Sequence, residues 1–175
     1  MKQTVSRQFG YDEAREHLIL DFLNNNFYLD NEGIRRHGFD ERTFADAVGK
    51  ASLREKSIVR YFTGKELERS IANGGSSDPV GMRVENGYNR ERSGDVIIVT
   101  APYTFFSEAK TGTTHGSPYE YDTHVPLLFF GFGVKSGEHN QACAPNDISA
   151  TLAFMLGIPK PEGCVGHVLK TMLKQ

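Results

Sequence analysis

Apolar positions in the first half of the chain fall into short runs that polar, Asn-rich or Gly-rich stretches interrupt. Residues 17–23 and 26–29 are apolar runs broken by the asparagines at 24–26, which predicts two strands around a turn. Residues 57–62 are rich in β-branched and aromatic side chains and predict a third strand that ends at Thr63–Gly64. This half of the chain therefore contributes short strands rather than one long element.

Helical patterns alternate with these strands. Asp40 is a good N-cap for a helix in which Phe44 and Val48 recur at helical spacing. A short helix is predicted over residues 65–72, and Pro79 suits the first turn of another. Strands and helices that alternate in this way predict a small α+β lobe.

The second half carries two continuous apolar runs, at residues 95–100 and 125–130. Continuous runs are typical of strands buried on both faces under helices, so we expect the two to be neighbours in one sheet. A helix packed on that sheet is predicted up to Leu156, with Asn146 or Asp147 as its cap and Gly157 as its stop. Its predicted apolar stripe consists of Ile148, Leu152 and Met155 or Leu156.

These patterns predict two parts, a small α+β lobe at residues 1–92 and an α/β core at residues 93–175. The 175 residues are 38% hydrophobic and 24% charged, which is typical of a soluble globular protein. No run approaches the ~20 apolar residues that span a bilayer, so no membrane partner is expected. The net charge of −2 gives no bulk attraction to nucleic acid.

The residues with the richest chemistry lie between the two apolar runs, at residues 112–124. These thirteen residues contain the imidazoles of His115 and His124, two carboxylates and several hydroxyls. Ligands of open α/β sheets bind at the ends of central strands, where this loop is expected. Gly116 allows close approach of the backbone beside His115. Imidazole suits zinc, and hydroxyl or carboxylate partners can hold its other nitrogen in the correct tautomer.

A plainer interpretation of the loop stays open. A single histidine in a Gly/Thr/Ser loop is commonly a surface residue, and Asp122 or His124 could anchor the loop by capping backbone N–H groups. The loop alone cannot complete a zinc site, because a zinc ion needs further ligands from elsewhere. Cys143 and Cys164 lack metal-binding spacing and could form a disulfide or be two buried thiols.

Several motifs together resemble a known family. The stretches Gly112–Tyr119 (GTTHGSPY) and Tyr121–Leu127 (YDTHVPL), followed by Gly131, resemble the C-terminal signature of PafA-type alkaline phosphatases, close relatives of the nucleotide pyrophosphatase/phosphodiesterases. Further similar segments are 86–88, 92–96, 145–152, 157–158 and Pro161. The similarity is strong over residues 86–170 and loose over 1–85. It implies the C-terminal part of an alkaline-phosphatase-like α/β/α sandwich, with the small α+β lobe.

The resemblance also implies a metal site. In that family two zinc ions clamp a phosphoryl group, and their ligands are an early Asp, a DxxxH pair, an Asp-His pair and a late His in the HG motif. Only the late His has a counterpart here, which is His115. His124 is the alternative ligand, and it and Asp122 otherwise support the loop. Thr113 and Thr114 lie in the wrong motif to be the family's nucleophile, so we assign no catalytic residue.

The function implied is that of a C-terminal segment of a zinc-dependent phosphatase acting on phosphate monoesters, with diesters as a second class. The isolated chain is expected to be inactive and to need an N-terminal segment as its partner. The resemblance implies the periplasm or secretion, although the N-terminus shows no apolar signal region. The alternatives are a non-catalytic binding or structural module, and a sulfatase or phosphonate-hydrolase relative.

Overall fold

The computed structural model describes residues 1–107 and 111–174, and the chain folds as two compact units, Met1–His124 and Val125–Gln175. The boundary at 92/93 that the sequence pattern predicts falls inside the first of these units. The reason is that residues 96–100 form a strand of the first unit's sheet rather than of a separate core.

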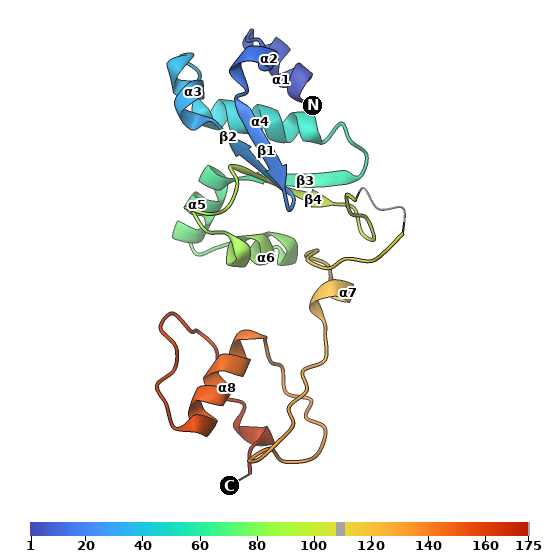
Figure 1. Ribbon diagram of the computed structural model, residues 1–175, viewed down its shortest axis with the longest axis vertical. Helices are drawn as coiled ribbons and strands as arrows, with labels where there is room; N and C mark the ends of the chain where they lie inside the picture. Colours follow the sequence, from blue (N-terminus) through green and yellow to red (C-terminus); the bar gives the residue numbers. More distant parts are fainter. Residues whose placement is uncertain (108–110, 175) are drawn as a thin grey trace. The chain divides into compact units, whose positions relative to one another are not determined.

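The first unit contains a four-stranded antiparallel sheet (Figure 1). Its strands are β1 (Ile19–Leu23), β2 (Asn26–Leu29), β3 (Ile58–Thr63) and β4 (Val96–Thr100), in the order β1-β2-β4-β3. The predicted hairpin of β1 and β2 is confirmed. Asn24 and Asn25 form its turn with φ values of 49° and 62°, a left-handed conformation that asparagine tolerates better than most residues.

Seven helices of the described residues accompany this sheet. They are α1 (Lys2–Phe9), α2 (Glu13–Glu16), α3 (Asn31–Arg36), α4 (Glu41–Ser52), α5 (Gly64–Ala72), α6 (Pro79–Gly87) and α7 (Glu120–Thr123). The predicted cap of α4 is confirmed, since the Asp40 carboxylate accepts a hydrogen bond from the Thr43 N–H at 2.8 Å. A capping box between Thr63 and Glu66 begins α5. Pro79 lies in the first turn of α6, as predicted.

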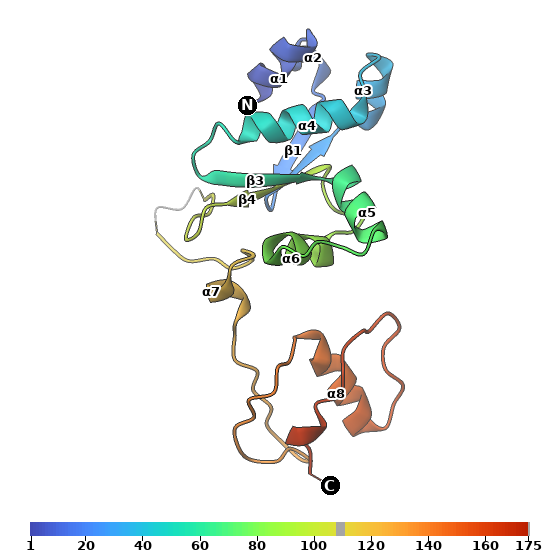
Figure 2. The ribbon, with the colours of Figure 1, turned by 180° about the vertical axis from the view of Figure 1, so that it is seen from behind.

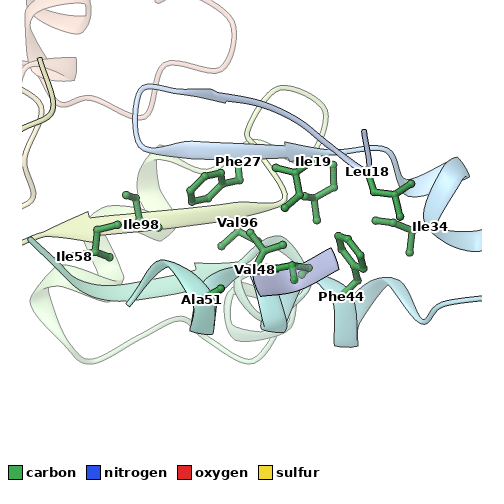
Figure 3. Close-up of a cluster of buried hydrophobic side chains, with 13 residues drawn as sticks. Leu18, Ile19, Phe27, Ile34, Phe44, Val48, Ala51, Ile58, Val96 and Ile98 are labelled. Atoms are coloured by element: carbon green, nitrogen blue, oxygen red, sulfur yellow. The ribbon is translucent and has the colours of Figure 1, made fainter. Parts of the chain in front are cut away.

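The core of the first unit lies between α4 and the sheet. Figure 3 shows Phe44, Val48 and Ala51 of α4 facing the apolar side chains of the strands. Phe44 and Val96 are fully buried. In Figures 1 and 2, α4 lies on one side of β3 and β4 and α6 on the other.

β4 is a central strand of the sheet, with β2 on one side and β3 on the other. The carboxylate of Asp95, just before β4, accepts hydrogen bonds from the Leu29 N–H at 2.8 Å and the Asn31 side-chain amide at 2.6 Å. These bonds join residues more than sixty positions apart. The lobe is therefore one folded unit that includes β4.

The second unit is built around α8 (Asn146–Leu156), with a short 3₁₀ helix at Lys170–Met172. Gly157 ends α8 in the left-handed conformation, as predicted. The predicted cap is wrong, because Pro145 occupies the N-cap position and the Asp147 carboxylate instead accepts from the backbone N–H groups of Ala144 and His167. Cys143 and Cys164, left open by the sequence, are free thiols.

The predicted apolar stripe of α8 is less buried than a stripe that faces a core would be. The buried positions of α8 are Asp147, Ala150, Thr151 and Ala153. Leu152 and Leu156 keep 43% and 69% of their surface exposed. Ile148 and Met155 of the same stripe are partly buried.

The predicted strand at residues 125–130 is not formed among the described residues, and the neighbours of β4 are β2 and β3. Leu128 and Phe130 are 89% and 104% exposed. A strand exists only where a second edge satisfies its backbone groups, and the described residues pair no such edge with this segment. None of the described helices has the length and apolar content needed to span a bilayer.

Candidate metal-ligand loop

His115 lies in the loop between β4 and α7, inside the first unit. The residue is exposed. It is followed by Gly116 with φ of 101°, a conformation that favours glycine. The expectation that Gly116 lets the backbone approach a ligand closely stays a prediction.

The Asp122 carboxylate holds this loop from α7. Its Oδ2 accepts a hydrogen bond from the Ser117 N–H at 2.6 Å. This bond lowers the pKa of Asp122, and the Gly116 N–H and the charge of His115 lower it further. The Ser117 hydroxyl lies against the same carboxylate, yet its buried oxygen makes no well-aligned hydrogen bond with the described residues. The interpretation of Asp122 as a loop anchor is confirmed.

Further bonds fix the segment after the loop to α6 and to β4. The Arg83 guanidinium of α6 donates to the Pro118 carbonyl at 2.6 Å, and the Tyr119 hydroxyl donates to the Thr100 carbonyl at 2.7 Å. The Tyr121 hydroxyl accepts from the Tyr103 N–H at 2.8 Å. The loop is therefore held at its C-terminal side by α6, by β4 and by Tyr103 just after β4.

A cavity of about 510 Å³ borders the loop. Its lining comes from the β1–β2 turn, α6, β4 and the loop itself, including Asn25, Arg83, Ile97, Val99, His115 and Ser117. Arg83 and the asparagine turn were missed in the sequence, because nothing local links a hairpin turn to a loop ninety residues later. The only available signal was the run of asparagines, which indicated a turn and not its neighbour.

The described residues do not contain a complete metal site. No group of three or more His, Cys, Asp or Glu side chains within residues 1–107 and 111–174 is placed to hold a metal ion. His124 ends α7 as its C-cap and its backbone N–H donates to the Glu120 carbonyl. One exposed imidazole suits zinc as a single ligand, so a complete site needs ligands from outside the described residues.

No protein-family model matches the sequence. Alkaline phosphatase PafA of Elizabethkingia meningoseptica is 34% identical over 174 residues, which cover 99% of this chain and 30% of that protein. The crystal structure of wild-type PafA matches 99% of this chain with a TM-score of 0.85 and 31% identity. This chain is homologous to PafA. The resemblance seen in the sequence motifs is confirmed.

Other curated relatives match the PafA-homologous chain over the same span. Alkaline phosphatase PhoV of Synechococcus elongatus is 39% identical over 98% of this chain and 30% of its own length. A Myroides odoratus protein named calcium-transporting ATPase is 39% identical over 100% of this chain and 31% of its own length. The chain therefore spans less than a third of the curated relatives it matches.

The comparison also confirms the predicted fold class. The PafA-homologous chain is a mixed α/β structure with a small antiparallel sheet, and it matches 32% of the PafA crystal structure as a C-terminal part of it. The solved PafA chain thus contains a further two thirds that has no counterpart here.

Proposed function

We propose that this chain is the C-terminal segment of a zinc-dependent phosphatase and that His115 supplies one zinc ligand. The observation that carries the proposal is the match of 99% of the chain to the PafA structure at a TM-score of 0.85. The loop is consistent with this proposal. The His115 imidazole lies exposed beside a cavity, and Asp122 accepts a hydrogen bond from the backbone of the loop. The proposed substrates are phosphate monoesters, with diesters as a second class, and the proposed location is the periplasm or outside the cell.

The proposed role of this chain is limited to the groups that its described residues supply. Its described residues contribute one imidazole to a zinc site, and no catalytic residue is assigned to it. The remaining ligands and the nucleophile would come from the part of the fold that PafA has and this chain does not. Zinc would act there as a Lewis acid on a phosphoryl oxygen. The chain's own residues hold His115, through Asp122, and shape the cavity beside it, through Arg83 and the β1–β2 turn.

The proposal is tested with a hybrid protein in which this chain replaces the 174 aligned residues of PafA. We expect the hybrid to hydrolyse p-nitrophenyl phosphate in a zinc-dependent manner, and the 175-residue chain alone to show no such turnover, because one imidazole cannot hold zinc tightly. A folded hybrid without activity would favour a non-catalytic module. Faster hydrolysis of p-nitrophenyl sulfate than of the phosphate would favour a sulfatase relative.

The assignment of His115 is tested in the same hybrid. His115→Ala should lower zinc content and reduce turnover by orders of magnitude, since the Lewis acid loses a ligand. His124→Ala should reduce turnover by roughly 10- to 100-fold, the range for a residue that supports a ligand. Zinc content and activity are measured side by side for the three proteins. A larger loss at His124 than at His115 would transfer the ligand role to His124.

A further inference from the structure

Asp122 reaches back along the chain to the residues that follow His115. It lies in the single turn of α7, and its Oδ2 is 2.6 Å from the Ser117 nitrogen five positions earlier. Asp122 thus binds the peptide N–H of the second residue after His115.

The loop needs such an anchor because its own backbone provides little restraint. Gly116 has φ of 101°, and a Cβ at this position would meet no atom within 4 Å, so packing does not hold the residue. Glycine has more backbone freedom than any other residue. His115 is exposed as well. The hydrogen bond from Ser117 to Asp122 is therefore a restraint on the backbone beside His115.

The C-terminal side of the loop is held by hydrogen bonds that do not involve Asp122. Arg83 and Tyr119 bind the loop's end to α6 and to β4. Removal of the Asp122 carboxylate should therefore free residues 115–117 while Pro118 and Tyr119 stay in place. This separation allows a local effect to be told from unfolding of the unit.

We propose that Asp122 is the positioning residue of the His115 ligand, which it orients by holding the Ser117 peptide N–H two residues further on. The inference rests on the proposed role of His115 in zinc binding. A rigidly held ligand loses less conformational entropy when it binds a metal ion, so an anchored loop binds zinc more tightly than a free one.

The chain supplies a matched control in Asp147 of the second unit. Its carboxylate accepts two backbone N–H bonds, from Ala144 at 2.8 Å and from His167 at 2.7 Å. Asp147 lies in α8, in the unit that does not contain His115. Asp147→Ala therefore removes the same kind of anchor without touching the loop.

The first measurement is amide hydrogen exchange in the 175-residue chain. Asp122→Ala should speed exchange at Ser117 by about ten- to hundredfold, the effect of losing a hydrogen bond to a charged acceptor, and leave β4 unchanged. Asp122→Asn, which keeps one acceptor oxygen, should show an intermediate effect and serves if the alanine variant unfolds. Asp147→Ala should speed exchange at residues 144 and 167 instead. Unchanged exchange at Ser117 in both Asp122 variants would overturn the proposal.

The second measurement is zinc affinity in the hybrid with PafA. Asp122→Ala should weaken zinc binding by roughly 10- to 100-fold, with turnover recovered at excess zinc, whereas Asp147→Ala should leave zinc affinity unchanged. Faster exchange with unaltered zinc affinity would reduce Asp122 to a structural residue. Retention of zinc by the His115→Ala variant would contradict the proposed function itself. The Asp122 variants test only the positioning role, so the two failures can be told apart.

Discussion

Two aspartates in this chain stabilise backbone turns by the same means, one in each unit. Asp147 is only 6% exposed, and its oxygens accept hydrogen bonds from the backbone N–H groups of His167 and Ala144. The His167 bond is the main cause that lowers the pKa of Asp147, and the Ala144 bond adds to it. The charged carboxylate therefore ties the start of α8 to the segment that follows it.

The stability of the second unit should depend on pH through Asp147. Because its pKa is lower in the folded than in the unfolded chain, its contribution is present above the unfolded value of about 4 and is lost as pH falls through the folded value. We expect Asp147→Asn to lower the melting temperature at pH 7, and this difference from the wild type to shrink toward zero in acid. Thermal unfolding followed between pH 7 and pH 2 measures it. A difference that stays constant over this range would contradict the assignment.

The two aspartates also show which side-chain roles can be predicted from residue type and spacing in the sequence. Asp122 was predictable as an anchor because it lies five positions after Ser117, in a loop already rich in polar groups. Asp147 was expected to cap α8, but one of its partners, His167, lies twenty positions further along. Arg83 was not predicted at all, since its bond to Pro118 spans thirty-five positions. Side-chain roles were predictable where the partner is local.

At the scale of elements, helix α4 approaches β3 closely at Gly49. A Cβ at this position would overlap the ring of Tyr61. The ring cannot move away freely, because the Tyr61 hydroxyl donates a hydrogen bond to Asp46 at 2.6 Å. Burial and this bond raise the pKa of Tyr61. The glycine thus allows the helix to pack directly on an aromatic side chain.

Gly49→Ala sets two effects against each other. Alanine favours the helix by about 1 kcal/mol over glycine, whereas forcing a methyl group into a packed contact costs about 1–3 kcal/mol. We expect the second effect to prevail, with a net loss of about 1 kcal/mol in the free energy of unfolding. Gly87→Ala in α6 is the control, since a Cβ there meets no atom within 4 Å. Urea denaturation compares the variants, and a more stable Gly49→Ala protein would show that Tyr61 moves aside.

The local sequence pattern predicted most helices and strands of the first unit. At residues 125–130 of the second unit it predicted a strand that the described residues do not form. The apolar runs of β4 and of this segment are alike, and each has side chains suited to a buried strand. β4 meets β2 and β3, whereas residues 125–130 meet no partner edge among the described residues. A helix satisfies its own backbone groups, but a strand depends on a second segment. The sequence of a segment therefore predicts whether its side chains suit a buried strand, but not whether another strand pairs with it.

At the scale of the whole molecule, the second unit leaves many large apolar side chains exposed. They are Val125, Leu128, Phe130, Phe132, Leu152, Phe154, Leu156, Ile158 and Val165. Phe130 and Phe132 are fully exposed, at 104% and 101%. Large exposed apolar surface favours association with other molecules or aggregation.

The isolated chain should therefore self-associate. Replacing Leu128, Phe130 and Phe132 together by Ser should reduce association and dye binding by exposed apolar surface, without a lower melting temperature, because these side chains contribute little buried area. Sedimentation velocity over a range of concentrations measures association. The matched control replaces Leu20, Leu23 and Val59, exposed on the first unit, by Ser. A wild-type chain that stays monomeric at high concentration would contradict the prediction.

The strand order β1-β2-β4-β3 also has a consequence for the time course of folding. The β1–β2 hairpin closes over two residues, and such hairpins form in about 1–10 μs. β2, however, finds its other neighbour only in β4, about seventy positions later, and β3 joins the sheet only through β4. Long-range pairing of this kind slows folding. During synthesis on the ribosome, the edges of β2 and β3 must wait until residue 100 has emerged, and during that interval their unpaired backbone groups are open to wrong pairing.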